Sequence, residues 1–278
     1  MTMNLTGSES PTAWLRSSDC VILAAHPDDE TVGAAWLLQH VPVCTVLHLT
    51  DGAPLDRSLC ATDALRTRQA YARIRRMEAL RAMDVVRIPQ DRVRCLGAVD
   101  QEATFALPEL VLCLVHALEE LRPGLLAVHA YEGGHPDHDS AAFVAHAACL
   151  LLRKRGSKVP LVVEMTSYHA AGGRLTIGQF VPGSGPPEVV VRLSNKERAR
   201  KSEMIACFGS QTPVLANFGV DVERFRLSPR YDFGRPPHPG RLHYERLEWI
   251  LTGEDWRLFA SVALRELGLG GMTYAAPC

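Results

Sequence analysis

The stretch Cys20-Val-Ile-Leu-Ala-Ala25 runs directly into His26-Pro-Asp-Asp-Glu30. A continuous apolar run of this length is typical of a strand that is buried on both faces of a parallel sheet. The abrupt change to polar residues marks the end of that strand. Ligands of open α/β sheets bind beyond the carboxyl ends of the strands, so this junction predicts both the fold class and the place of the functional site.

Strand-like and helix-like segments alternate from this stretch as far as residue 165. Apolar runs predict further strands at 43–49, 93–96, 125–129 and 159–165. Helix-forming residues and apolar spacing predict helices at 31–40, 63–83, 108–121 and 140–152. The alternation indicates an α/β fold with a mostly parallel sheet and helices on both faces. In the common strand order 3-2-1-4-5, the ligand crevice lies between the first and fourth strands.

The pattern changes after residue 168. Segments 174–181 and 188–193 flank a Pro- and Gly-rich turn, which predicts a β-hairpin or a small antiparallel addition. Helices are expected at 196–208, with Ser194 as the N-cap, and at 254–267.

One main domain is expected from the length of the chain. We expect residues 1–19 to be an N-terminal extension and residues 20–278 to form a single domain. Within that domain, residues 20–169 would be the core and residues 170–278 a C-terminal elaboration.

Composition excludes several classes of function. Thirty basic and 31 acidic residues give a net charge of −1, so no overall field attracts nucleic acid or an anionic membrane. Residues 1–19 lack the apolar core of a signal peptide, and no apolar run approaches the ~20 residues of a membrane span.

The eight cysteines form no CxxC pair, which favours reduced thiols and a cytoplasmic protein. No G-x-G-x-x-G motif follows a strand, so dinucleotide binding has no support. Nothing in the sequence indicates the oligomeric state.

A second polar cluster follows the fourth predicted strand, at His129-Ala-Tyr-Glu-Gly-Gly-His135-Pro-Asp-His138-Asp139. It would meet the first cluster across the crevice. Two histidines and one carboxylate with an open fourth position are a common ligand set for catalytic zinc. His26 and Asp29 are three residues apart and would bind one ion from the same loop, with His138 completing the set from the other side.

The remaining residues of the two clusters suit hydrolysis. Zinc lowers the pKa of a bound water, and Asp28, next to Asp29, is placed to take the proton of that water. His135, three residues before His138, is placed to donate a proton or to stabilise negative charge. Asp137 would orient the His135 ring, as carboxylates do for catalytic histidines.

The paired motifs Ala25-His-Pro-Asp-Asp-Glu30 and His135-Pro-Asp-His138 resemble the signature of the LmbE/PIG-L zinc-dependent N-deacetylases. The resemblance runs from about residue 21 through the fifth strand, and weakly into 223–226 and 231–233. It implies a Rossmann-like fold, a Zn²⁺ cofactor and hydrolysis of N-acetyl groups on amino sugars. The substrate would therefore be a small N-acylated amino sugar or its conjugate.

Matching by motif position implies the same roles for the site residues. His26, Asp29 and His138 would be the metal ligands, Asp28 the general base, and His135 the oxyanion stabiliser or general acid, supported by Asp137. Arg75 and Glu78 resemble the R-x-x-E stretch of the family, in which the arginine reaches the substrate; Arg73 and Arg76 are alternatives. Tyr168, at the end of the fifth strand, is a candidate for lining the substrate crevice.

Structural roles compete with functional ones at several positions. His129, His48 and Asp51 are expected to be cap or turn residues. Glu30 would either complement the dipole of the following helix or hold a ligand histidine. The other arginines of the 63–83 helix are expected on its solvated face, and the segments after Phe208 are expected to pack against the core.

Three function classes remain open on the sequence alone. The leading one is a zinc-dependent N-deacylase of amino sugars, in which cobalt, nickel or ferrous iron would also substitute in vitro. The second is a metal-dependent hydrolase of another amide or of an ester. The third is a non-enzymatic Rossmann-like binding protein whose histidines are structural. For the first, we expect a crevice lined with hydrogen-bonding groups, without a large apolar tunnel unless the substrate carries a long acyl chain.

Overall fold

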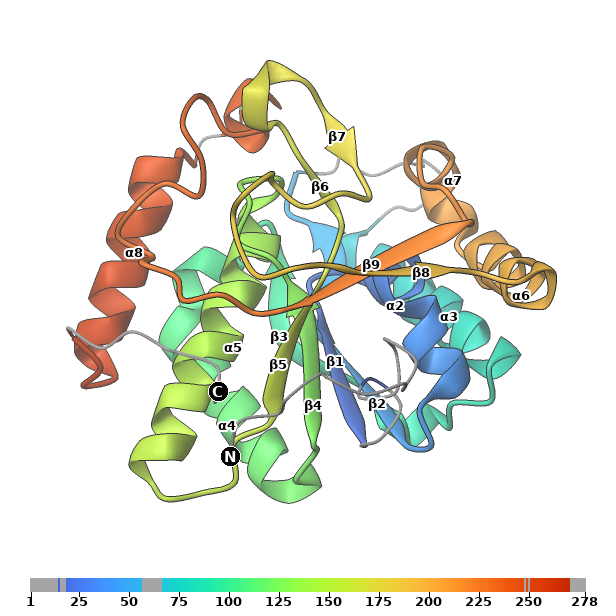
Figure 1. Ribbon diagram of the computed structural model, residues 1–278, viewed down its shortest axis with the longest axis horizontal. Coiled ribbons are helices and arrows are strands. Elements are labelled where there is room, and N and C mark those ends of the chain that lie inside the picture. The colour runs from blue at the N-terminus through green and yellow to red at the C-terminus, as the bar shows by residue number, and fades with distance from the viewer. Residues whose placement is uncertain (1–14, 16–18, 57–66, 248, 250, 271–278) are drawn as a thin grey trace.

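A mixed sheet forms the centre of the protein (Figure 1). The computed structural model describes residues 15, 19–56, 67–247, 249 and 251–270. Within these residues the main sheet has seven strands in the order β3-β2-β1-β4-β5-β9-β8. They are β1 (Cys20–Ala24), β2 (Cys44–Pro54), β3 (Val93–Asp100), β4 (Leu125–His129), β5 (Leu161–Met165), β8 (Val189–Arg192) and β9 (Val222–Leu227). The first five are parallel, as predicted, while β9 is antiparallel to β5 and β8 is antiparallel to β9. The predicted α/β class and the order 3-2-1-4-5 are confirmed.

Helices cover both faces of this sheet. The helices are α2 (Asp29–His40), α3 (Arg68–Val85), α4 (Leu107–Leu121), α5 (Pro136–Lys154), α6 (Asn195–Ala206), α7 (Thr212–Leu215) and α8 (Gly253–Glu266). The 3₁₀ turns are η2 (Gln90–Arg92), η3 (Ala103–Ala106), η4 (Ala171–Gly173), η5 (Gly209–Gln211) and η6 (Tyr244–Leu247). Helices α4, α5 and α8 pack on one face, and α2, α3 and α6 pack on the other (Figure 1). Each face therefore has its own apolar core.

Two helices begin where their caps require rather than where the sequence pattern suggested. The helix predicted at 63–83 begins at Arg68, because the Thr67 side chain accepts a hydrogen bond from the Ala70 N–H; residues 63–66 lie outside the described part. The helix predicted at 140–152 is α5, which begins four residues earlier at Pro136 with His135 as N-cap. Asp137, His138 and Asp139 of the second polar cluster therefore lie in the first turn of a helix, and His135 caps it.

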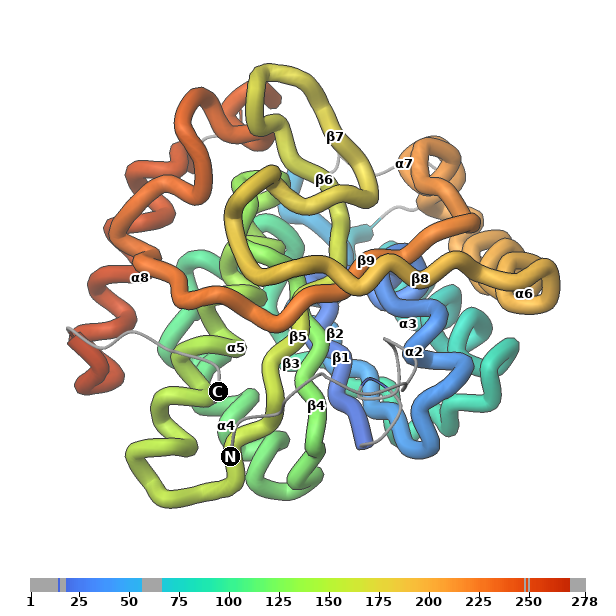
Figure 2. The backbone as a smooth tube through the Cα atoms, viewed as in Figure 1, coloured from blue at the N-terminus to red at the C-terminus, as the bar shows by residue number. Residues whose placement is uncertain are grey.

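The antiparallel addition differs in pairing from the predicted hairpin. Strand β7 (Thr176–Ile177) pairs with β6 (Tyr168–His169), while β8 pairs with β9. The expected hairpin between 174–181 and 188–193 is thus wrong, whereas the small antiparallel addition is confirmed. Alternating apolar residues identify a strand but do not choose its partner. Figure 2 shows β6 and β7 at the end of the sheet where the parallel strands finish.

Helix α2 is kinked and is held by the C-terminal half of the chain. Ala34 has a non-helical φ of −139°, and two side chains from the C-terminal half contact the backbone beside this kink. Glu223 on β9 accepts the Trp36 N–H at 2.9 Å, and Lys201 on α6 donates to the Val32 carbonyl at 2.6 Å. Lys201 and Glu223 also pair with each other at 2.8 Å. This buried ion pair therefore lies at the kink, where side chains that bond to the helix backbone are a usual cause of bending.

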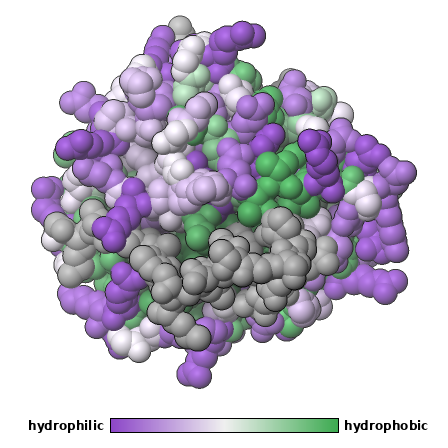
Figure 3. All heavy atoms as spheres, viewed as in Figure 1, coloured by the Kyte–Doolittle hydropathy of each residue, from purple (hydrophilic) through white to green (hydrophobic). Residues whose placement is uncertain are grey.

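The outer surface is mostly polar. Figure 3 shows hydrophilic side chains over most of one face, with a hydrophobic area where the edge strand β8 lies in Figure 1. No helix in the described part of the chain is long and apolar enough to cross a membrane.

Candidate active site

The two polar clusters meet where the strand order reverses. Strands β1 and β4 are adjacent and parallel, with β2 beyond one and β5 beyond the other. Their carboxyl ends therefore deliver His26 and the start of α2 beside the first turn of α5. The crevice predicted between the first and fourth strands is present at this position.

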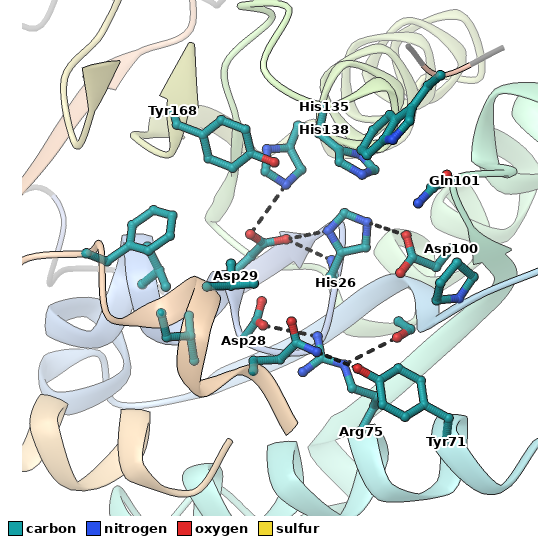
Figure 4. Close-up of a pocket in the computed structure, with 18 residues that line it drawn as sticks. His26, Asp28, Asp29, Tyr71, Arg75, Asp100, Gln101, His135, His138 and Tyr168 are labelled. Carbon is teal, nitrogen blue, oxygen red and sulfur yellow. Dashed lines mark hydrogen bonds and ion pairs between the residues drawn. The ribbon is translucent and has the colours of Figure 1, made fainter. Parts of the chain in front are cut away.

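His26, Asp29 and His138 form a group that fits a metal ion, and we call these three residues the metal-binding group. Their ligand atoms all lie within 4.8 Å of one another. His26 Nδ1 is 3.2 Å from Asp29 Oδ2, and His138 Nε2 is 3.4 Å from Asp29 Oδ1 (Figure 4). All three side chains are buried. Two imidazole nitrogens and one carboxylate oxygen are a donor set that zinc accepts.

The other nitrogen of His26 faces two further carboxylates. His26 Nε2 lies 3.1 Å from Asp100 Oδ1 and 3.1 Å from Asp137 Oδ2. Burial lowers the pKa of His26, but the carboxylates of Asp100, Asp137 and Asp29 outweigh it and hold that pKa well above its usual value. These contacts fix the ring so that Nδ1 points toward Asp29, as carboxylates do behind metal-binding histidines.

His135 is oriented by the backbone of Asp137 and not by its carboxylate. As N-cap of α5, His135 accepts the Asp137 N–H on Nδ1 at 3.1 Å. The neutral ring therefore carries its proton on Nε2. The Asp137 carboxylate, which the sequence suggested would support His135, instead faces His26 and accepts the Gln101 N–H at 2.6 Å. Burial, followed by the neighbouring His26 and His138, holds the pKa of His135 well below its usual value, which favours the neutral form.

Asp28 occupies a strained backbone position beside the metal-binding group. Its φ of 136° lies in the region that favours glycine, and its N–H is accepted by the Glu30 carboxylate at 3.1 Å. Its Oδ2 accepts a hydrogen bond from Arg75 Nη2 at 3.0 Å (Figure 4). Burial raises the pKa of Asp28 to about 7, although Arg75 acts to lower it. A carboxylate with such a pKa is well matched to proton transfer near neutral pH.

Arg75 is distinguished from the neighbouring arginines by its burial. It is 3% exposed and lines the pocket, whereas Arg73 and Arg76 are exposed. Its Nε donates to the Gly52 carbonyl at 3.3 Å, and its Nη1 forms no hydrogen bond within the described residues but lies 3.9 Å from Glu78 Oε2. Arg75 thus pairs with both Asp28 and Glu78 at the edge of the pocket.

The residues expected to be cap or turn residues lie within strands instead, His48 and Asp51 in β2 and His129 at the end of β4. His129 accepts the Ala25 N–H on Nε2 at 3.1 Å and stacks on His138 with ring centroids 4.0 Å apart. Glu30 is fully buried and accepts from His48 Nε2 at 3.0 Å, so it holds a histidine outside the metal-binding group. Asp51 pairs with Arg68 at 2.5 Å.

Tyr168 lies over the metal-binding group, as the sequence suggested for a crevice residue. Its ring centroid is 5.3 Å from that of His138, and it lines the pocket (Figure 4). Gly134 allows the Tyr168 backbone to lie this close, because a Cβ at residue 134 would stand 2.1 Å from the Tyr168 carbonyl oxygen. The glycine before His135 is therefore needed for the close approach of β6 to the active site.

One cavity of about 210 Å³ is bordered by His26, Asp28, Asp29, Arg75, Asp100, His135, His138 and Tyr168. Residues 21–149 match the family model PIG-L: GlcNAc-PI de-N-acetylase. Over these residues, which are fewer than half of the chain, the protein is similar to the PIG-L family. The matched range includes both histidine and aspartate motifs and ends within α5. The expected enzyme class, a metal-dependent amide hydrolase of the de-N-acetylase type, is confirmed at the level of this family.

Solved structures support the PIG-L fold beyond the matched range. The A40926 pseudoaglycone deacetylase Dbv21 is 19% identical, with a TM-score of 0.55 over 74% of this chain and 95% of its own. A deacetylase of the teicoplanin biosynthesis pathway is 16% identical, with a TM-score of 0.53 over 76% and 98%. The 4-carboxy-2-hydroxymuconate hydratase GalB from Pseudomonas putida KT2440 is 15% identical, with a TM-score of 0.51 over 75% and 95%. No curated protein sequence matches the chain.

Several pocket residues were not found from the sequence. Asp100 ends β3, Gln101 follows it, and both line the pocket; the rule that ligands bind at strand ends would have found them. Trp249 and the segment after η5 also line it, although the sequence suggested that the segments after Phe208 only pack against the core. These segments carry no local pattern that distinguishes a pocket wall from a core contact.

Proposed function

We propose that the protein is a zinc-dependent hydrolase that removes an N-acyl group from an amino sugar or an amino-sugar conjugate. The observation that carries the proposal is the arrangement of Asp28 beside the His26, Asp29 and His138 group in one pocket. His26, Asp29 and His138 would hold the ion. Bound zinc would polarise the amide carbonyl and make water more acidic, so that the water attacks at neutral pH.

Asp28 would act as the general base. Its carboxylate borders the pocket, and the contact from Arg75 holds one of its oxygens in place at 3.0 Å. The proton of the attacking water would pass to this carboxylate, which would return it to the amide nitrogen as the C–N bond breaks, so that an amine and a carboxylate leave. Arg75, which lines the pocket, would donate to a polar group of the substrate, which agrees with the role that the family resemblance implies.

His135 would stabilise the negative charge that develops on the amide oxygen. Its Nδ1 is occupied by the Asp137 N–H, so Nε2 is the donor that the neutral ring offers to the pocket. A donor that is already oriented needs no reorganisation during the reaction, which is the basis of oxyanion stabilisation. Asp137 would act on both histidines, through its carboxylate on His26 and through its backbone on His135.

One side of the pocket suits the hydroxyl groups of a sugar. Asp100 and Gln101 offer an acceptor and an amide, and the Trp249 ring lies with its centroid 4.8 Å from that of His135. An aromatic ring beside polar groups is a common surface for a sugar. The family description, which names an amino-sugar amide, and the glycopeptide deacetylases of the same fold support this substrate class.

The test combines metal analysis with amine release. We expect the purified protein to hold one divalent ion per chain and to release primary amine from N-acylated amino sugars. Activity that survives complete metal removal would contradict the proposal. Turnover of simple esters or of non-sugar amides alone would favour the broader hydrolase class. A metal-free protein with unchanged ligand binding and no hydrolysis would favour a non-enzymatic binding protein.

A further inference from the structure

One side of the active-site pocket is apolar. Val32 on α2, Val214 and Leu215 on α7, and Phe218 just beyond α7 all line it. We call these four residues the apolar wall. Three of them lie after residue 208, outside the part of the chain that matches the PIG-L family model. Their pattern is therefore a property of this chain's C-terminal half.

The apolar wall begins directly beside the metal-binding group. Val32 follows Asp29 by three residues on α2, so the two side chains share one face of the helix. Tyr168 connects the metal-binding group to Phe218, because its ring centroid lies 5.3 Å from that of His138 and 6.3 Å from that of Phe218. A chain that starts at the metal-binding group would pass the Tyr168 ring before it reaches Phe218.

The segment that carries the wall is fixed in place by buried polar contacts. Ser210 donates to the Glu78 carboxylate through its N–H at 2.8 Å and its hydroxyl at 2.6 Å. Gln211 donates to the Tyr71 hydroxyl at 2.7 Å. Leu215 is buried in the apolar core on the face of the sheet that α2, α3 and α6 cover. The wall is therefore part of the scaffold and keeps its shape when the pocket is empty.

Val214 remains 49% exposed although it borders the pocket. An apolar side chain at a pocket mouth loses contact with water only when a ligand covers it. The opposite side of the pocket offers Asp100 and Gln101, which are polar. The pocket thus presents different chemistry on its two sides, as an amphiphilic ligand requires.

We propose that the apolar wall binds the acyl group of the substrate and that this acyl group is an alkyl chain longer than acetyl. The inference rests on the proposed function, because it takes the amide to lie at the metal-binding group. An acetyl methyl ends one bond beyond the carbonyl carbon, so it cannot extend past the Tyr168 ring to Phe218. A longer chain would cover Val214 and Phe218, and each buried methylene would strengthen binding about two- to fourfold.

Binding of straight-chain carboxylates tests the wall without knowledge of the sugar. Acetate, butanoate, hexanoate and octanoate carry the acyl part of the products, and calorimetry on the zinc-loaded protein gives their dissociation constants. We expect the constant to fall about two- to fourfold per methylene from butanoate onward. In Val214→Ser and Phe218→Ala this dependence should flatten. Leu258→Ser is the matched control, since Leu258 is 60% exposed on α8 and does not line the pocket.

The outcomes separate this inference from the proposed function. Dissociation constants that do not depend on chain length, or no binding at any length, would overturn the wall as an acyl site. The wall would also be overturned if the dissociation constants depended on chain length equally in wild type and in Val214→Ser. Because Val214 is exposed, its substitution is not expected to disturb folding. Amine release from N-acetyl to N-octanoyl glucosamine is measured in parallel. Graded carboxylate binding without any amine release would overturn the proposed hydrolysis and leave the apolar wall standing.

Discussion

The neighbouring aspartates Asp28 and Asp29 are chemically identical, and only the backbone gives them different partners. Asp29 faces three histidines, His26, His129 and His138, whereas Asp28 faces Arg75. We predict that Asp29→Asn loses metal and activity together. Asp28→Asn should keep its metal while kcat falls by about 10²–10⁴-fold, the usual contribution of a positioned base. Elemental analysis and steady-state kinetics on both variants provide the measurement, and the reverse result would exchange the two roles.

The positive φ of Asp28 leads to a second prediction at the same residue. Both Asp28→Gly and Asp28→Ala remove the carboxylate, so their difference reports the backbone alone. At a φ of 136° only glycine is unstrained, and we expect Asp28→Gly to be more stable than Asp28→Ala by about 1–2 kcal/mol. Urea unfolding measures this difference. Equal stability would mean that the backbone relaxes when the carboxylate is lost.

Single residues also mark the limit of what the sequence could predict. The sequence predicted that His26, Asp29 and His138 lie close together, and the structure brings them together because their strands end at one edge of the sheet. The contact between the Asp137 carboxylate and His26 was not found, because it depends on α5 beginning at Pro136. A shift of four residues in a helix start decides which atom of Asp137 meets which histidine.

At the scale of elements, local signals placed most helices and strands. Ser194 was predicted as the N-cap of α6, and it forms a capping box with Glu197; Thr252 and Asp255 form another on α8. We expect Ser194→Ala to lower the free energy of unfolding by about 1 kcal/mol, since an orphaned helix N–H loses its acceptor. Thr252→Ala is the comparison on a second helix. A change within experimental error in both variants would mean that tertiary packing alone sets these helix starts.

The same capping box predicts a pH dependence. Burial acts to raise the pKa of Glu197, but hydrogen bonds with Ser194 and His40 lower it to about 2. Because the folded pKa lies below the unfolded value of about 4.3, the stabilisation is full above the unfolded value and is lost as pH falls toward 2. Glu197→Gln should therefore lower stability at pH 6 and have little effect near pH 2. Denaturant unfolding at the two pH values measures this, and an equal effect at both would contradict it.

Pairing between distant elements was the part of the fold that local signals missed. Burial alternates along β8 as an edge strand should, yet 29 residues, including α6 and α7, separate it from its partner β9. No turn signal connects strands separated by two helices. The predicted hairpin with 174–181 followed from proximity in sequence, whereas the sheet places β8 beyond β9.

At the scale of the whole molecule, the buried metal-binding group should couple metal binding to stability. An ion that binds only the folded protein adds about 2.7 kcal/mol when its free concentration is a hundred times Kd. We therefore expect removal of zinc by a chelator to lower Tm by about 5 °C or more. Differential scanning calorimetry with and without chelator measures this. In Asp29→Asn, the chelator should leave Tm unchanged. An unchanged Tm in the wild-type protein would contradict metal binding at this site.

The kink in α2 has a consequence for recombination between relatives. Two backbone groups inside the helix that begins with Asp29 form hydrogen bonds with Lys201 and Glu223, which lie about 170 residues or more further along the chain. A chimera that takes its motif-bearing half from this protein and its second half from a relative without that lysine and glutamate would lose both of these hydrogen bonds to charged side chains, at about 1.5–3 kcal/mol each. Chimeras that fold are therefore expected to inherit α2, α6 and β9 from the same parent. In a shuffled library selected for folding, these three segments should come from one parent far more often than chance allows.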